Sequence, residues 1–150
     1  MLDLDRIRAS ADIGAELAGQ TEELRAAGVI TQAEYAAVPV RMLRDFFASP
    51  IGVRLLASAR VEREWAFTCR MQDESGQDML LQGVVDCCFM ENGKWVLVDY
   101  KTDALRDIAA ILEKHRPQLH YYARALESIT KTPVRERIVY LVRAGAGYPV

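Results

Sequence analysis

The dipeptide Asn92-Gly93 separates two runs rich in apolar and β-branched residues, GVVDCCFM before it and KWVLVDYKT shortly after it. Asn-Gly in this position is the strongest short signal for a β-hairpin, because both central residues of a type I′ turn need positive φ. The dipeptide therefore predicts the register of the two strands, in which Glu91 pairs with Lys94.

Counting back from this turn places Asp86 directly opposite Asp99. Lys101 follows two residues later and lies on the same face of the hairpin, since side chains alternate along a strand. Residues in opposed positions have Cβ atoms ~4.5–5.5 Å apart, so two carboxylates there repel each other and destabilise the sheet. The opposite face is expected to be core: Val85, Cys87, Phe89, Val96, Val98 and Tyr100.

A divalent cation would compensate the two carboxylates directly. Carboxylate oxygens are the ligands that Mg²⁺ and Mn²⁺ prefer, and Mg²⁺ commonly takes one or two carboxylates together with water and substrate phosphate. A lysine beside the ion can orient the attacking water and stabilise charge on a phosphate oxygen. The pattern favours metal-assisted phosphodiester hydrolysis, and its alternatives are a proton shared by the two acids or an Asp–Lys pair at the sheet rim.

The bulk composition bounds the class of protein. With 150 residues and 51% hydrophobic content, the chain can form one domain with a core. A net charge of −2 excludes a strongly basic nucleic-acid-binding arm. No apolar run approaches the ~20 residues of a membrane span and no signal peptide is recognisable, so we expect a cytoplasmic location. The three cysteines are interpreted as small apolar residues in a reducing compartment.

The periodicity changes near residue 60. Three helices are predicted, over 11–28, 31–47 and 49–59. The second begins with a capping box formed by Thr31 and Glu34, and Pro39 is expected to kink or break it. Strands are predicted over 61–71, 79–90 and 94–102, with a turn over 73–78. A helix over 107–130, in which Pro117 marks the start or a kink, and a strand over 134–144 complete a mixed sheet of three to four strands.

Three motifs follow one another in the second half of the chain: G-x-x-D at Gly83–Asp86, D-Y-K-T at Asp99–Thr102 and Q-x-x-x-Y at Gln118–Tyr122. In this order and at these distances they resemble the RecB-like branch of the PD-(D/E)XK nuclease superfamily. The segments ELRAAGVITQAEY, FFASPIGVRLL and REWAF are similar, more particularly, to the C-terminal nuclease domains of the AddA helicase–nuclease subunits.

The resemblance covers nearly the whole chain and implies an α/β fold. We expect a restriction-endonuclease-like core, a mixed β-sheet flanked by helices, preceded by a helical N-terminal segment. Residues 1–150 are expected to be a single nuclease domain, with a helical part at 1–60 and the catalytic core at 61–150.

The resemblance also implies roles for single residues. Asp86 and Asp99 are expected to be catalytic metal ligands for Mg²⁺, which Mn²⁺ can replace, and Lys101 the catalytic lysine. Glu64 stands where the family often has an acidic residue on the preceding strand. It either supports the metal site or caps the sheet edge.

Gln118 and Tyr122 lie four residues apart, on one face of the predicted helix. In the family this face borders the site and touches the DNA strand. The alternative interpretation is that Tyr122 belongs to the core and Gln118 to the helix N-terminus.

The chain departs from the family pattern in its histidines. The RecB-like branch usually has a histidine on an upstream helix, and here none precedes His115. We therefore expect the chain to be a fragment of a larger protein, and it contains no GxxxxGK[ST] phosphate loop for ATP hydrolysis. His115 and His120 either face the site or are solvated or packed.

The second departure is charge, because a pI near 5.7 predicts weak DNA binding. A helicase that feeds single-stranded DNA into the site would remove the need for tight binding. The candidates for local phosphate contacts are Arg63, Lys114, Arg116 and Arg124.

The resemblance implies a metal-dependent DNA nuclease domain with single-stranded DNA exonuclease activity, acting behind a helicase in double-strand break repair. The implied partners are single-stranded DNA ends, the helicase part of the same full-length chain and an AddB-like second subunit. Two alternatives remain: a catalytically inert truncated domain that serves as a docking or DNA-binding module, and a free-standing PD-(D/E)XK nuclease.

Overall fold

The computed structural model describes residues 1–72, 75–103 and 106–150, which form two compact units, Met1–Ala57 and Ser58–Val150. No helix within these ranges is long and apolar enough to cross a bilayer. The predicted turn over 73–78 falls partly on residues 73 and 74, outside the described residues, and Asp78 already belongs to a strand. The assignment of the whole chain to one nuclease domain stays a prediction.

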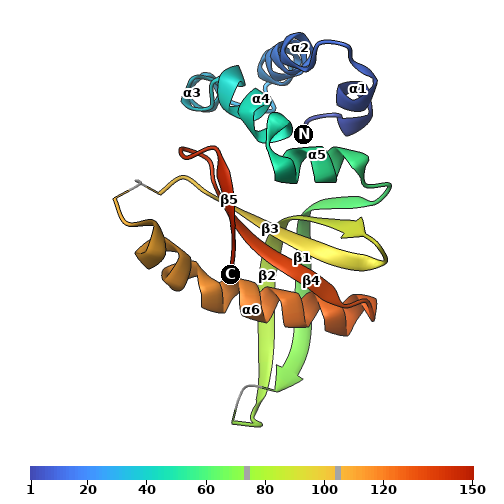
Figure 1. Cartoon of the computed structure of the whole chain (residues 1–150), viewed down its shortest axis with the longest axis vertical. Coiled ribbons are helices and arrows are strands. Elements are labelled where there is room, and N and C mark those ends of the chain that lie inside the picture. Colours follow the sequence, from blue (N-terminus) through green and yellow to red (C-terminus); the bar gives the residue numbers. More distant parts are fainter. Residues whose placement is uncertain (73–74, 104–105) are drawn as a thin grey trace. The chain divides into compact units, whose positions relative to one another are not determined.

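The first unit is entirely helical, as predicted (Figure 1). Its helices are α1 (Leu4–Ala9), α2 (Ile13–Ala26), α3 (Gln32–Ala37), α4 (Val40–Ala48) and α5 (Pro50–Ala57). The capping box of Thr31 and Glu34 is present at the start of α3. Pro39 breaks the predicted second helix and occupies the N-cap position of α4, without a side-chain hydrogen bond to the helix. Ser49 Oγ accepts a hydrogen bond from Gly52 N at 3.2 Å, which confirms its N-cap role for α5.

Gly52 allows α5 to lie directly against the end of α4. A Cβ at this position would come within 2.0 Å of the Phe46 carbonyl oxygen. Around this contact the helices bury a small core: Leu4, Ile7, Leu17, Phe46, Phe47, Ile51 and Leu55.

The second unit contains a mixed five-stranded sheet in the order β1-β2-β3-β4-β5 (Figure 1). The strands are β1 (Val61–Gln72), β2 (Asp78–Glu91), β3 (Lys94–Lys101), β4 (Val134–Leu141) and β5 (Ala146–Pro149). Only β3 and β4 run parallel, and helix α6 (Ile108–Thr130) connects them. The predicted α/β fold class is confirmed, but the expected three to four strands are too few. The fifth was missed because AGYP lacks a strand pattern and ends in proline, which is tolerated at a sheet edge.

Helix α6 crosses one face of the sheet (Figure 1) and covers the core cluster of this unit. The Asp107 side chain caps it by accepting from Ala110 N at 3.0 Å. The helix continues through Pro117, so the alternative that Pro117 marks its start is wrong. Buried members of the cluster are Phe67, Cys69, Val85, Cys88, Trp95, Leu97, Ile111, Leu119, Ala125, Leu126, Val139 and Leu141.

Candidate active site

The β2–β3 hairpin forms around Asn92 and Gly93, both of which have positive φ, at 51° and 74°. Such a pair is what a type I′ turn requires. The strands pair from Glu91–Lys94 back to Cys87–Val98. The register predicted from the turn is therefore confirmed over these five pairs.

The ladder stops one pair before the two aspartates would meet. Asp86 and Asp99 come next in register, but they do not form a ladder pair. Instead Asp86 Oδ2 accepts a hydrogen bond from Tyr100 N at 2.9 Å. The expectation of two directly opposed carboxylates needs this correction, because the side chain of Asp86 now binds a backbone amide of β3.

Strand β2 also changes its alternation at this point. Val85 and Cys88 both belong to the core cluster beneath α6, although three positions apart they would face opposite sides of a regular strand. The irregularity therefore lies at Asp86, which is missing from both ladders, and simple alternation from the turn could not have predicted it.

Glu64 occupies the matching irregular position on β1. The pairs Arg63–Cys87 and Trp65–Val85 flank a gap in the ladder where Glu64 would face Asp86. Glu64 is exposed and has a positive φ of 51°, a conformation that L-residues other than Asn, Asp and Gly seldom adopt. The register thus aligns Glu64, Asp86 and Asp99 across three neighbouring strands.

Asp99 is almost fully buried, at 4% exposure, and its Oδ2 lies 2.8 Å from the Lys101 ammonium. Oδ2 accepts no hydrogen bond of regular geometry, so this contact is an ion pair. Burial raises the pKa of Asp99, and the nearby Asp86 acts in the same direction, whereas Lys101 and, more weakly, His115 oppose the rise. The site thus holds a carboxylate whose charge is incompletely compensated.

His115 projects from α6 toward the same region. Its side chain is only 12% exposed, its Nε2 makes no hydrogen bond, and it lies 3.6 Å from Asp103 Oδ2. Asp103, which sequence reasoning did not select, also contacts Lys114 at 3.3 Å, and this hydrogen bond lowers the pKa of the Asp103 carboxyl. Its place two residues after Lys101 was the only signal that could have drawn attention to it.

Tyr122 packs across β2 from the middle of α6. A Cβ on Gly83 would lie 2.7 Å from the Tyr122 hydroxyl, so the glycine of G-x-x-D lets the tyrosine approach the strand. Tyr122 also makes an edge contact with Phe67, with ring centroids 5.2 Å apart. Tyr122 therefore packs at the edge of the core. Gln118, on the same helix, is half-buried.

The cysteines behave as buried apolar groups. Burial raises the pKa of Cys87 to about 11 and that of Cys88 to about 12. Both thiols therefore stay protonated at neutral pH, and neither has the thiolate character of a nucleophile or a metal ligand.

Asp86 and Asp99 offer carboxylate oxygens, the ligands that a hard divalent cation prefers. Within the described ranges no group of three or more His, Cys, Asp or Glu side chains is placed to hold a metal. Two carboxylates do fit a Mg²⁺ ion that keeps several waters and binds substrate phosphate. The buried Asp99 Oδ2 lies beside the Lys101 ammonium without a regular hydrogen bond, so it has lone pairs to offer a cation.

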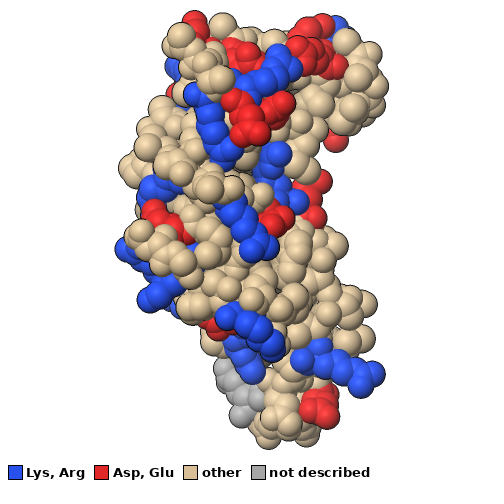
Figure 2. Space-filling view, turned by 90° about the vertical axis from the view of Figure 1, so that its right-hand side faces the viewer, with Lys and Arg blue, Asp and Glu red and all other residues tan. Residues whose placement is uncertain are grey.

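On the face drawn in Figure 2, Lys and Arg side chains are interspersed with Asp and Glu, in keeping with the net charge of −2. Any contact with phosphate must therefore be made by local groups of basic residues.

Comparison with known proteins also indicates a nuclease. The family model described as PD-(D/E)XK nuclease superfamily matches residues 4–148. A protein of Acetivibrio thermocellus, named as a subunit of an ATP-dependent helicase/nuclease, is 41% identical over 144 residues, covering 87% of this chain and 12% of the relative. Proteins of the same name from Clostridium kluyveri and Lysinibacillus sphaericus are 37% and 36% identical, covering 81% and 82% of this chain. The chain spans 11–12% of the length of these three relatives.

Proposed function

Because the chain belongs to the PD-(D/E)XK nuclease superfamily, we propose that Asp86, Asp99 and Lys101 form the active site of a metal-dependent deoxyribonuclease. Nucleases of this superfamily generally use divalent metal ions. The observation that carries the proposal is the buried Asp99, held 2.8 Å from Lys101 and close enough to Asp86 for their charges to interact. Perturbed carboxylates of this kind are typical of functional sites.

Asp86 and Asp99 would hold the ion, Mg²⁺ with Mn²⁺ as a substitute. When bound, the ion lowers the pKa of a coordinated water and neutralises charge on the phosphate. Asp86 Oδ2 is fixed by the Tyr100 amide, so this carboxylate has one orientation before any ion arrives. Preorganisation of this kind reduces the cost of assembling the site.

Lys101 has two roles in this proposal. Without a cation it partly offsets the charge of Asp99. If Asp99 held a cation, the Lys101 ammonium would be free to donate to a phosphate oxygen or to orient the attacking water. Glu64, Gln118 and Tyr122 are proposed to support the site or contact DNA, with Glu64 aligned beside Asp86 and Tyr122 packed on β2.

The relatives named as helicase/nuclease subunits lead to a proposal for the whole protein. In the cytoplasm, a helicase in the same full-length chain would feed single-stranded DNA ends to this domain, which acts as an exonuclease. An AddB-like second subunit would complete the enzyme, and double-strand break repair would be its task.

One observation favours a second candidate, an inert docking or DNA-binding module. In the described ranges the two aspartates are already engaged, by Tyr100 N and by Lys101, and no third metal-binding side chain completes the site. Under this interpretation the ion pair is structural, and the domain contributes only binding.

Cleavage of a labelled single-stranded oligonucleotide separates the two. The nuclease proposal predicts degradation with Mg²⁺ or Mn²⁺, none with EDTA, and a loss on the order of 10²–10³-fold in Lys101→Ala. A circular single strand should resist, since an exonuclease needs an end. Metal-dependent cleavage that persists in both Asp99→Asn and Lys101→Ala would refute the assigned site, and no cleavage with either metal would favour the module.

A further inference from the structure

Two hollows open where α6 runs beside β4, and both are lined by His120 and Arg137. One, of about 340 Å³, extends to Arg116 and Tyr121, and the other, of about 200 Å³, extends to Arg124 and Glu127. Because they share two residues they form one continuous depression, the α6–β4 groove. Neither hollow includes Asp86, Asp99 or Lys101, so the groove is a separate feature.

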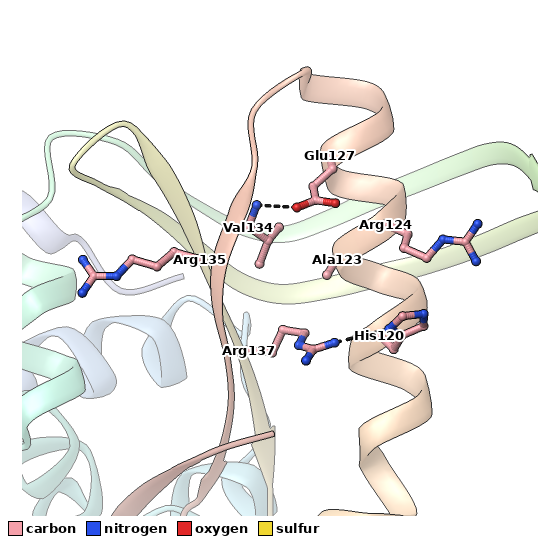
Figure 3. A pocket seen from close by; sticks show the side chains of 7 residues that line it. All are labelled: His120, Ala123, Arg124, Glu127, Val134, Arg135 and Arg137. Atoms are coloured by element: carbon pink, nitrogen blue, oxygen red, sulfur yellow. Dashed lines mark hydrogen bonds between the residues drawn. The ribbon is translucent and has the colours of Figure 1, made fainter.

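A β-bulge in β4 directs Arg137 into this groove. Trp95 pairs with Val134 and Val96 with Glu136, which leaves Arg135 as an extra residue. Arg135 extends away from α6 (Figure 3) and pairs with Glu91 at 3.0 Å. Val134 and Arg137 consequently both lie on the side of α6.

The positive charge of the groove is neutralised only in part, because Arg116 pairs with Glu113 at 2.8 Å. In the described part of the chain, Arg137 has no carboxylate partner, and its one polar contact is His120 Nδ1 at 3.3 Å. Arg124 donates to the Gln72 carbonyl at 2.7 Å, which leaves its charge uncompensated. Glu127, the acidic residue of the groove, accepts from Val134 N at 2.7 Å (Figure 3) and keeps its negative charge, which offsets one of these arginines.

The donors available in the groove suit an anion with several oxygens. A guanidinium only donates hydrogen bonds, so Arg137 is the donor in its contact with His120 Nδ1. The remaining guanidinium N–H groups of Arg137 stay available. Such a planar donor set matches phosphate oxygens well.

The groove is too long for a single small anion. Arg116, His120 and Arg124 follow one another at four-residue spacing and form one stripe on α6. At ~1.5 Å of rise per residue, the two arginines are about 12 Å apart along the helix axis. A stripe of this length matches a chain of phosphates.

We infer that the α6–β4 groove binds the sugar–phosphate backbone of single-stranded DNA, with Arg137 contacting phosphate inside the groove and Arg124, which extends away from β4 (Figure 3), contacting the next phosphates at its rim. The inference rests on the proposed function for the identity of the polymer. It adds a backbone site outside the catalytic residues, which an acidic chain needs if it is to hold a strand while cutting it.

The test is binding of a fluorescein-labelled oligothymidine of about 15 nucleotides, followed by anisotropy in EDTA so that no cleavage occurs. Arg137→Ala and Arg124→Ala should each weaken binding about tenfold and reduce the slope of log affinity against log salt by about 0.7. The matched control is Arg70→Ala, an exposed arginine on β1 with no partner among the described residues, and it should change neither quantity.

The melting temperatures of the variants show whether they fold. If Arg137→Ala does not fold, the binding affinity of Arg124→Ala tests the inference. Affinities of both groove variants equal to that of Arg70→Ala would overturn the inference. If the groove variants bind DNA like wild type while metal-dependent cleavage is present, only the groove inference is wrong. If the groove variants bind DNA more weakly but wild type does not cleave, only the nuclease proposal is wrong.

Discussion

At the scale of single residues, the site combines a buried acid with a partner of opposite charge. Asp99 is 4% exposed, and the attraction of Lys101 at 2.8 Å does not fully offset the cost of burying its charge, since its pKa remains raised. A group with this balance destabilises the empty fold and gains from a bound cation. The proposed catalytic carboxylate thus lowers the stability of the metal-free fold.

The raised pKa of Asp99 predicts a pH-dependent difference between wild type and Asp99→Asn in EDTA. The folded state holds the proton more tightly than the unfolded state, so the contribution of Asp99 to stability is present below the unfolded pKa of 3.8 and is lost as pH rises through the folded value. The melting temperature of Asp99→Asn minus that of wild type should therefore increase from acid toward neutral pH. A difference that shrinks over this range would show that Lys101 overcompensates burial.

The positive φ of Glu64 predicts opposite effects on stability and activity. Glu64→Gly removes the steric penalty of φ 51° and should raise the free energy of unfolding by up to about 1 kcal/mol. Glu64→Ala keeps the penalty and should leave stability nearly unchanged. Both remove the carboxylate beside Asp86, so both should lower cleavage if Glu64 supports the site. Chemical denaturation and cleavage rates of the two variants measure this, and full activity in both would leave Glu64 as an edge cap only.

At the scale of elements, helix α6 organises the catalytic unit. It carries His115 near Asp99 and Asp103, packs Tyr122 on β2 and lines the α6–β4 groove with His120 and Arg124. One helix thus joins three features that lie on different strands of the sheet. Its close approach to β2 depends on Gly83, because a side chain at this position would collide with Tyr122.

Gly83→Ala should destabilise the unit by about 1–3 kcal/mol, because its Cβ would lie 2.7 Å from the Tyr122 hydroxyl. In a Tyr122→Ala background the same substitution should cost far less, since the colliding ring is absent. A double-mutant cycle by urea denaturation measures the coupling between the two positions. Equal costs in both backgrounds would mean that the glycine is needed for its backbone and not for this contact.

At the scale of the whole molecule, the sequence predicted the elements better than their irregularities. The Asn92-Gly93 turn correctly predicted the register of five residue pairs, and the capping box at Thr31 correctly predicted the start of α3. These signals are local, so they can be read without the fold. The motifs at Gly83, Asp99 and Gln118 then indicated the family that the comparison supports.

What could not be predicted depends on contacts between distant segments. The shift of β2 at Asp86, the bulge at Arg135 and the approach of Tyr122 to Gly83 each involve two or more elements. Periodicity assumes regular strands, so it placed Asp86 directly opposite Asp99. Strand β5 pairs with β4 although its four residues have no strand pattern of their own.

The most direct test of the central claim is a titration of the chain with Mn²⁺, followed by calorimetry. Asparagine is the informative replacement, because its side-chain oxygen still accepts from Tyr100 N at position 86. We predict saturable binding to wild type, affinity reduced about tenfold or more in Asp86→Asn and Asp99→Asn, and affinity retained in Lys101→Ala, since lysine competes with the ion for Asp99. Equal affinity of wild type and both asparagine variants would contradict the proposed metal site.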